Sequence, residues 1–386
     1  MGAPSEIVLG IDLGTTYSTA AAVVDGKLHF AVDGRGEPCV PSVVHFPKSG
    51  PPLVGADADR ARAGDPQNTV FGIKRLLGRA ADSPQGRLLD ACSAFKIVAQ
   101  GAGEAAVEVR SGTYSASEVA ALLLRYLRER AEARFRRPVK RAVLTAPVGA
   151  DERVQQAMVR CGRMAGLEVV RIVPEPCAGA LARGVGISSE RPVLVYDFGG
   201  GTFDATVVQR DGAALRALSA SGDDCLGGDD FSLAFARFVE AGVYRVHKVE
   251  VSRDVLLWDQ VQRQCEMVKR ALSAAEEARF RIPDAFSGGG RPRDLEFTFR
   301  RDHLAPSWTP LVERSLAAAA DGLAQAAVAV QDLAGVLLIG GTTFVPLVRS
   351  AVASAFPVPC VAEDDPQTAV ARGAALLAAH PEILTA

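Results

Sequence analysis

The fold of this chain is decided by GIDLGTT at residues 10–16 and by DFGGGTFD at residues 197–204. Each stretch follows an apolar run, residues 7–11 and 193–196, that predicts a buried strand. Each then leads through glycine and threonine into a second β-prone run. An Asp-Gly pair, typical of a hairpin turn, follows at 25–26 and again at 211–212. The chain is therefore predicted to contain two copies of one strand–loop–strand unit.

Loops of this composition are suited to binding phosphate. Glycines allow the backbone to approach an anion closely, and their N–H groups form a concave nest to which threonine hydroxyls add donors. A carboxylate such as Asp12 or Asp197 repels phosphate unless a cation lies between them. Two facing copies therefore predict a site for a polyphosphate and a metal ion.

Composition excludes several classes of protein. The 386 residues are 48% hydrophobic and 23% charged, as expected for a globular chain of two or more compact units. A net charge of −2 offers no electrostatic footprint for nucleic acid. The seven cysteines form no Cys-x-x-Cys pair, so we expect reduced thiols in a cytoplasmic protein rather than disulfides or zinc. Neither a signal peptide nor a membrane-spanning run is predicted.

Strand and helix patterns alternate along the chain, which predicts an α/β protein. We expect helices at 117–134, with Ser115 or Ser117 as N-cap, and at 151–165, 231–246, 258–278, 315–330 and 368–379. Strands are expected at 139–145, 169–173 and 336–339. Residues 39–112 contain six prolines and are expected to be an irregular inserted subdomain, and residues 287–292 a loop tip.

Several segments resemble the nucleotide-binding domain of the DnaK (seventy-kilodalton heat-shock) chaperone family. They are residues 10–18, 68–78, 173–181, 196–204 and 226–231, and the resemblance covers nearly the whole chain in order. The duplicated hairpin alone indicates only the wider superfamily of actin, sugar kinases and chaperone ATPases. The resemblance implies an actin-like (ribonuclease H-like) ATPase fold: two lobes, each with a mixed sheet and flanking helices, and a central nucleotide cleft. Lobe I would be 1–190 plus 365–386 with 39–112 inserted, and lobe II 191–364 with 228–303 inserted.

The resemblance also implies roles at the phosphate end of the cleft. Lys74, which by itself could be a surface lysine beside Arg75, would contact phosphate and help orient the attacking water. Glu175, at a helix start where an acid also suits the helix dipole, would organise water near the γ-phosphate. Asp12 and Asp197 would hold Mg²⁺ through water. The remaining catalytic and cation positions would be Thr202, Asp204 (a candidate proton acceptor) and, for potassium, Tyr17 with Thr202 and Asp204.

The nucleoside end can be approached from helical periodicity. Glu266, Lys269, Arg270 and Ser273 are spaced i, i+3, i+4 and i+7, so they share one face, which is typical of a solvated helix surface. By resemblance this face would instead bind ribose and adenine. The implied ATP-binding set also includes Gly14, Thr15, Thr16, Tyr17, Gly199, Gly200, Gly201, Thr202, Gly228, Gly340, Gly341, Thr342 and Phe344.

The sequence departs from the family pattern at four places, one of which is Pro174, in place of a polar residue before Glu175. Phe344 stands where the family usually has an arginine flanking adenine, and would either stack on the base or be buried. The segment 365–368, with Gln367, replaces a more acidic pattern. Residues 148–151 (VGAD) replace an aromatic pair that relays nucleotide state in the family, although Pro147 and Arg171, a switch proline and a J-protein contact, match.

The resemblance implies slow hydrolysis of Mg-ATP to ADP and phosphate that drives a heat-shock chaperone cycle, with a J-domain co-chaperone and a nucleotide exchange factor as partners. No peptide-binding domain is expected within this chain; one could lie outside it, or the chain could be a stand-alone, divergent domain. The alternatives are a nucleotide-binding scaffold with little hydrolysis, a small-molecule kinase of the superfamily, and an actin-like filament former.

Overall fold

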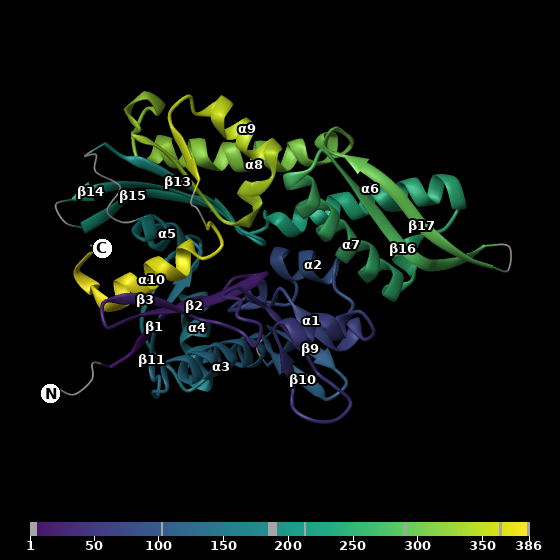
Figure 1. Cartoon of the computed structure of the whole chain (residues 1–386), viewed down its shortest axis with the longest axis horizontal. Helices are drawn as coiled ribbons and strands as arrows, with labels where there is room; N and C mark the ends of the chain where they lie inside the picture. The colour runs from purple at the N-terminus through teal and green to yellow at the C-terminus, as the bar shows by residue number, and fades with distance from the viewer. Residues whose placement is uncertain are drawn as a thin grey trace.

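The computed structural model describes residues 6–101, 103–183, 191–211, 214–288, 291–362 and 365–383. Helices and strands alternate along it, which confirms the predicted α/β class. Figure 1 shows two lobes, the purple-to-blue part of the chain forming the lower one and the green-to-yellow part the upper one. The last helix, α10 (Ala369–Ala379), returns to the seam between them.

The main sheet of the first lobe has the strand order β12-β11-β1-β2-β3, with β4 beside β2. β1 is parallel to β11, which is parallel to β12, whereas β1, β2 and β3 are antiparallel in turn. Asp25 and Gly26 join β2 to β3 with φ of 50° and 74°, the left-handed backbone that a two-residue hairpin turn requires. The bounds are β1 (Val8–Asp12), β2 (Tyr17–Val24), β3 (Lys27–Ala31), β4 (Val40–Pro41), β11 (Arg141–Ala146) and β12 (Glu168–Pro174).

The second lobe repeats this arrangement with the order β15-β14-β13-β18-β19. β13 is parallel to β18, β18 is parallel to β19, and β13, β14 and β15 are antiparallel in turn. The matching topology shows that the two motifs open equivalent sheets. Gly212, predicted in the second hairpin turn, lies outside the described residues. The bounds are β13 (Val193–Phe198), β14 (Phe203–Asp211), β15 (Ala214–Asp223), β18 (Gly335–Ile339) and β19 (Cys360–Ala362).

Two helices confirm the sequence signals that predicted them. α3 (Ala116–Phe135) begins after Ser115, whose hydroxyl accepts from the Glu118 N–H while the Glu118 carboxylate accepts from the Ser115 N–H. α4 (Glu152–Met164) begins after Asp151, whose carboxylate accepts from the Val154 N–H at 3.0 Å. α3 packs on β2 and β3, and α4 on β12, so both cover the first sheet.

The two sheets are joined through a pair of crossing helices. α5 (Glu175–Arg183) packs on β13 and β14, and α10 packs on β1 and β2. A Cβ at Gly373 in α10 would lie only 1.6 Å from the Ala178 carbonyl oxygen in α5, so the crossing requires glycine there. A separate apolar cluster, with Val173, Ile339 and Val370 among its members, fills this junction.

The expectation that residues 39–112 are irregular is wrong. They form two three-stranded sheets, β6-β5-β7 and β10-β9-β8, and two helices. The prolines lie at element ends; Pro84, for example, is the first helical residue after the N-cap Ser83, where a missing N–H costs nothing. The bounds are β5 (Val43–His45), β6 (Leu53–Val54), α1 (Ala56–Arg62), β7 (Thr69–Phe71), α2 (Pro84–Asp90), β8 (Lys96–Gln100), β9 (Glu104–Val109) and β10 (Gly112–Ser115).

Three expected boundaries in the second lobe also need correction. The helix predicted at 258–278 is α7 (Val255–Ala274), because Glu277 already begins a strand. The helix predicted at 315–330 is α8 (Arg301–Gln325), which begins earlier and includes Pro306 and Pro310. Most of the loop tip at 287–292 belongs to strands, and residues 289–290 lie outside the described part. The remaining elements are α6 (Gly228–His247), β16 (Glu277–Gly288), β17 (Arg291–Arg300) and α9 (Pro346–Ala355).

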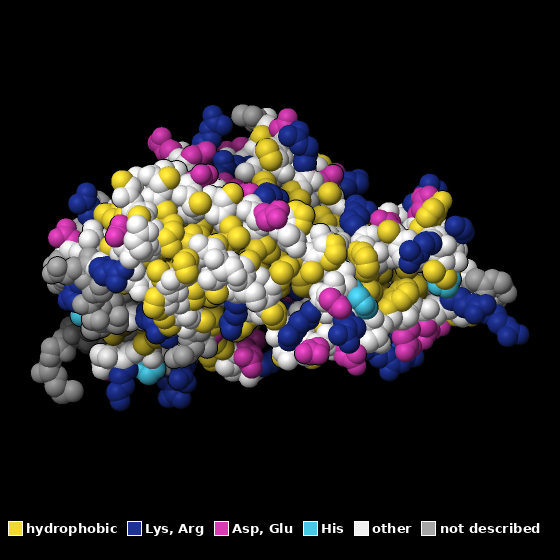
Figure 2. All heavy atoms as spheres, turned by 90° about the horizontal axis from the view of Figure 1, so that it is seen from above, with side chains coloured by type: hydrophobic (Ala, Val, Ile, Leu, Met, Phe, Trp, Pro, Cys, Tyr) yellow, Lys and Arg dark blue, Asp and Glu magenta, His cyan; other side chains and the backbone are white. Residues whose placement is uncertain are grey.

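On the face drawn in Figure 2, which is the molecule seen from above, basic and acidic side chains of the described residues are interspersed. Within the described part of the chain, none of the helices is both long and apolar enough to cross a membrane.

Candidate active site

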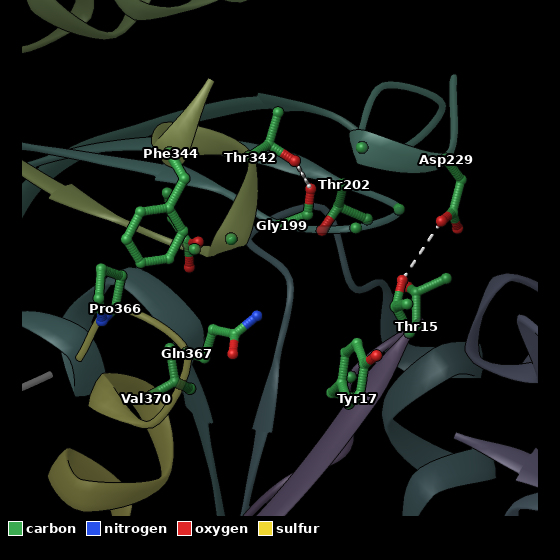
Figure 3. A pocket seen from close by; sticks show the side chains of 18 of the residues that line it. Thr15, Tyr17, Gly199, Thr202, Asp229, Thr342, Phe344, Pro366, Gln367 and Val370 are labelled. Carbon is green, nitrogen blue, oxygen red and sulfur yellow. Dashed lines mark hydrogen bonds between the residues drawn. The ribbon is translucent and has the colours of Figure 1, made fainter. Parts of the chain in front are cut away.

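A cavity of about 470 Å³ lies between the lobes, a size typical of small-molecule sites. Both motifs, the starts of α5 and α6, one face of α7 and the segment after β18 contribute to its wall. In Figure 3, Thr15 and Tyr17 face the loop with Gly199 and Thr202, and Phe344 lies at the end near Pro366. The predicted residues on the wall are Asp12, Gly14, Thr15, Thr16, Tyr17, Lys74, Glu175, Asp197, Gly199, Gly200, Gly201, Thr202, Gly228, Glu266, Lys269, Arg270, Ser273, Gly340, Gly341, Thr342 and Phe344.

The two glycine-rich loops meet face to face. A Cβ at Gly200 would lie 1.9 Å from the Thr16 hydroxyl oxygen, and one at Gly201 would lie 2.5 Å from the Thr15 hydroxyl oxygen. Side chains larger than hydrogen are therefore excluded from the second loop. The bare backbone and the threonine hydroxyls form the kind of surface that cradles phosphate oxygens.

Lys74 lies at the phosphate end and is not a surface residue. It belongs to a 3₁₀ helix, Ile73–Leu76, that follows Gly72 in the left-handed conformation, and its ammonium donates to the Glu175 carboxylate at the start of α5. Their side chains are 7% and 8% exposed. Burial opposes the charge on Lys74, but Glu175 and Asp12 outweigh it and raise the lysine pKa.

An acidic cluster surrounds the Lys74 ammonium. Its carboxylates are those of Asp12, Glu175, Asp197 and Asp204. Burial, reinforced by Glu175, raises the pKa of Asp12 to about 7, and burial with Glu175 and Asp204 raises that of Asp197 well above its usual value. Both shifts arise first from burial of the carboxylates and then from their mutual repulsion, which Lys74 offsets only in part. The cluster is therefore short of positive charge.

Asp204 is the one predicted site residue that the structure does not place on the cavity wall. It is buried in β14, directly opposite Asp197 in the sheet register, and accepts the Val148 N–H at 3.0 Å. Burial and the nearby Glu175 raise its pKa to about 8. It lies behind the wall and fastens the 147–150 loop to the acidic cluster.

The carboxylates of Asp12 and Asp197 suit a hydrated divalent cation. Within the described ranges, no three His, Cys, Asp or Glu side chains are grouped closely enough to hold an ion directly. Asp12 and Asp197 line the same cavity as the phosphate loops, and magnesium usually keeps several waters and one or two carboxylates. The residues present therefore fit magnesium held through water together with a polyphosphate.

At the other end, α7 presents a network rather than a solvated stripe. Lys269 is buried and donates to the Gly228 carbonyl at 2.6 Å and to the Ser232 hydroxyl at 2.9 Å. Glu266 pairs with Lys269 and with Arg270, at 2.5 and 2.6 Å. Burial opposes ionisation of Glu266, but the two cations prevail and lower its pKa to about 2. Ser273, one turn further along, also lines the cavity.

Tyr17 faces this network and not the acidic cluster. Its hydroxyl accepts from Arg270 at 2.9 Å, and the guanidinium lies 5.1 Å from the ring centre. Its carbonyl oxygen, in contrast, lies against the first loop, 2.0 Å from where a Cβ on Gly14 would be. A potassium ion near the phosphates could therefore use only the backbone of Tyr17.

Phe344 is 40% exposed and lines the cavity, so the expectation that it could be buried is wrong. The Arg349 guanidinium lies 5.4 Å from its ring centre. Figure 3 shows Gln367 on the same side, with Pro366 beside Phe344. An aromatic ring and an amide thus both line this part of the cavity.

Five wall residues were not assigned in the sequence analysis: Asp229, Val345, Pro366, Gln367 and Val370. Asp229 accepts from the Thr16 hydroxyl at 3.4 Å, drawn as the dashed line beside Thr15 in Figure 3, and it pairs with Arg75 at 3.8 Å. The sequence could have indicated Asp229, because it lies two residues after Gly227, at a helix start beside a predicted phosphate loop. Val345 follows Phe344, Pro366 and Gln367 precede α10, and Val370 lies in the first turn of α10. Of these, only Gln367 was noted in the sequence, as a departure from the family pattern.

Comparison with known proteins agrees with this geometry. The family model described as "Hsp70 protein" matches residues 8–384. The chain belongs to the Hsp70 family. It is 33% identical over 375 residues to "Heat shock protein SSC3, mitochondrial" of Saccharomyces cerevisiae, covering 97% of this chain and 58% of that protein. It is 35% identical over 370 residues to "Heat shock 70 kDa protein, mitochondrial" of Solanum tuberosum, covering 96% and 54%, and 34% identical, with the same shares, to the protein of that name in Pisum sativum.

The chain thus spans about half the length of these curated Hsp70 relatives. The expectation of a cytoplasmic location is wrong by the same comparison, because all three carry the word mitochondrial in their names. That expectation rested on unpaired cysteines, which distinguish a reducing from an oxidising compartment but not one reducing compartment from another.

Proposed function

We propose that this Hsp70-family chain binds Mg-ATP in the central cavity and hydrolyses it slowly to ADP and phosphate. The observation that supports this most directly is the buried Lys74–Glu175 pair at the end of a cavity lined by both glycine-rich loops. A scaffold that only bound nucleotide would have no need to hold a lysine and a glutamate, at some cost in desolvation, where the γ-phosphate would lie.

Each residue near the γ-phosphate would have a separate role in the reaction. Bound magnesium, held through water by Asp12 and Asp197, would supply charge neutralisation. Lys74 would hold the attacking water and stabilise negative charge on the transferred group, with Glu175 fixing the ammonium. Asp204, which has a raised pKa but lies behind the cavity wall, would accept the proton that the attacking water loses through an intervening water molecule.

At the nucleoside end, Glu266 and Lys269 would bind the ribose, and Ser273 the base edge. Arg270 and Phe344 would enclose the adenine. The carboxylate surplus would also attract a monovalent cation such as potassium near Thr202 and the Tyr17 carbonyl.

The two lobes would be 1–190 plus 365–386 and 191–364, with 39–112 and 228–303 as insertions. Because the site takes residues from both, ATP and ADP would favour different lobe angles, as in a heat-shock chaperone cycle. A J-domain co-chaperone, a nucleotide exchange factor and a peptide-binding domain beyond this chain would be the partners.

Single-turnover hydrolysis tests the proposal. Nucleotide-stripped protein is mixed with substoichiometric ATP, and ADP is measured after acid quench with Mg²⁺ in potassium, with Mg²⁺ in sodium, and with excess chelator. We expect slow conversion with Mg²⁺, faster in potassium, and none with chelator. Tight ATP binding without conversion in any buffer would refute hydrolysis and favour the scaffold. Conversion only after a sugar is added would favour a kinase.

A further inference from the structure

A second, smaller cavity adjoins the phosphate end of the nucleotide cavity. The two share the wall residues Thr15, Lys74 and Thr202. The smaller cavity measures about 30 Å³, which is room for a water molecule but not for a phosphate ion. Its wall includes Pro147 and Asp224 and no residue of α7, so it extends from Lys74 away from the nucleoside end.

Basic groups line this passage. Lys74, Arg75 and Arg79 all belong to its wall. The Arg75 side chain is only 3% exposed, and its Nη1 has no hydrogen-bond partner among the described residues. A buried, unpartnered guanidinium N–H is costly, and it suits a transient anion with several acceptor oxygens.

An ion pair closes the outer end. Arg79 Nη2 lies 3.0 Å from Asp224 Oδ2, and Arg79 Nη1 lies 3.3 Å from Asp151. Arg79 follows the Lys74 segment in the first lobe, whereas Asp224 follows β15 in the second, so the Arg79–Asp224 pair spans the seam. Their side chains are 23% and 28% exposed, so the passage reaches solvent here.

Beside this pair lie the small residues at which the sequence departs from the family pattern. Ala150 lines the passage, and a Cβ on Gly149 would lie 3.0 Å from the Asp224 carboxylate. The Val148 N–H bond to Asp204 holds this loop to the acidic cluster. Aromatic side chains at these positions would compete for the space.

We propose that this passage releases inorganic phosphate through the lobe seam ahead of ADP, with the Arg79–Asp224 pair as its gate. The inference rests on the proposed hydrolysis. After cleavage the phosphate would lie beside Lys74, with ADP between it and the wide mouth at α7. Movement of the lobes separates Arg79 from Asp224 and widens the passage, and Arg75 binds the phosphate on the way out.

Entry of [³²P]phosphate into the preformed Mg-ADP complex, followed by rapid filtration, measures this passage without requiring hydrolysis. Asp224→Ala removes the gate, and we expect phosphate exchange to become roughly two- to fivefold faster, the range set by a partly exposed ion pair. Ala150→Phe fills the passage, and exchange should be slower than in Ala150→Ser. The matched control is Arg62→Ala, which breaks the cross-lobe Arg62–Asp259 pair outside this wall and should leave phosphate exchange unchanged.

Equal exchange rates in the Asp224→Ala, Ala150→Phe and wild-type proteins would overturn the passage. Acid-quench measurements on the same proteins keep this outcome separate from the proposed function. If the wild-type protein cleaves ATP but neither variant changes the rate of phosphate exchange, the passage alone is refuted. If the wild-type protein does not cleave ATP, the proposed hydrolysis is refuted. If Ala150→Phe fails to fold, Asp224→Ala at the partly exposed end still decides the question.

Discussion

Replacing Lys74 with alanine should separate binding from cleavage. The Lys74 ammonium lies against Glu175 and close to Asp12, and it is the cation of the acidic cluster. In the proposed site, ATP would also be bound by the glycine loops and the α7 network, which the substitution does not touch. We therefore expect an ATP dissociation constant close to that of the wild type.

The cleavage rate should fall much further. Removing one group that stabilises charge in a transition state typically costs about 10²–10³ in rate, or roughly 3–4 kcal/mol. The same substitution also leaves Glu175 buried without its partner, which lowers the free energy of unfolding by about 3–5 kcal/mol. That is a large part of the total stability of a domain, so loss of activity alone does not prove the role.

The double variant Lys74→Ala/Glu175→Gln resolves this ambiguity. Because no buried carboxylate is then left unpaired at position 175, we expect most of the unfolding free energy to return while cleavage stays low. Urea unfolding gives the stability, equilibrium titration with a fluorescent ATP analogue gives the affinity, and acid-quenched single turnovers give the rate. A folded Lys74→Ala protein that cleaves ATP at nearly the wild-type rate would refute the reasoning, and so would a double variant that regains cleavage.

Three further outcomes are expected. The pKa of about 2 for Glu266 lies below the value in the unfolded chain. The ionised carboxylate therefore contributes to the free energy of unfolding above pH 4.5, and this contribution is lost as the pH falls toward 2. Glu266→Gln should therefore lower the unfolding free energy by about 1–2 kcal/mol at pH 7, less at pH 3, as measured by urea titration. Phe344→Ala should weaken ATP binding about five- to tenfold while Phe344→Tyr does not, because a base stacked on an aromatic ring gains about 1–3 kcal/mol; equal dissociation constants would exclude stacking. Gly373→Ala should lower the melting temperature sharply, whereas Gly242→Ala, in a helix with open space around it, should raise it slightly; the reverse order would contradict the α5–α10 crossing.

The sequence revealed the parts of the site whose chemistry is local. The two glycine loops, with Asp12 and Asp197, could be found because glycine and threonine next to a buried strand have few other uses, and because the unit occurs twice. Helix starts at Ser115 and Asp151 were predictable for the same reason, since a capping side chain bonds within three residues.

What the residues alone could not predict depends on partners distant in the chain. Lys74 and Glu175 were expected at the site only by resemblance, because they are 101 positions apart and each alone is typical of an ordinary surface lysine or a helix-start acid. Arg75 is covered by Asp229 and Asp230 of the other lobe, which no periodicity can indicate. The sheets in 39–112 were missed because their strands are as short as two residues and pair across long intervals, such as Val43 with Phe71.

The distribution of the site over both lobes explains why nucleotide state would be felt by the whole molecule. Lys74, Glu175 and Asp12 belong to the first lobe, and Asp197 with the second glycine loop to the other, so a γ-phosphate bound between them would bridge the two. The carboxylate surplus makes that bridge depend on cations, because without them the lobes present like charges to each other and to the nucleotide. Under the proposed function, cleavage would convert one bridging anion into two separate ones, and fewer contacts would then hold the lobes together at the seam. A phosphate passage gated by Arg79 and Asp224 across that same seam would tie product release to the opening of the lobes.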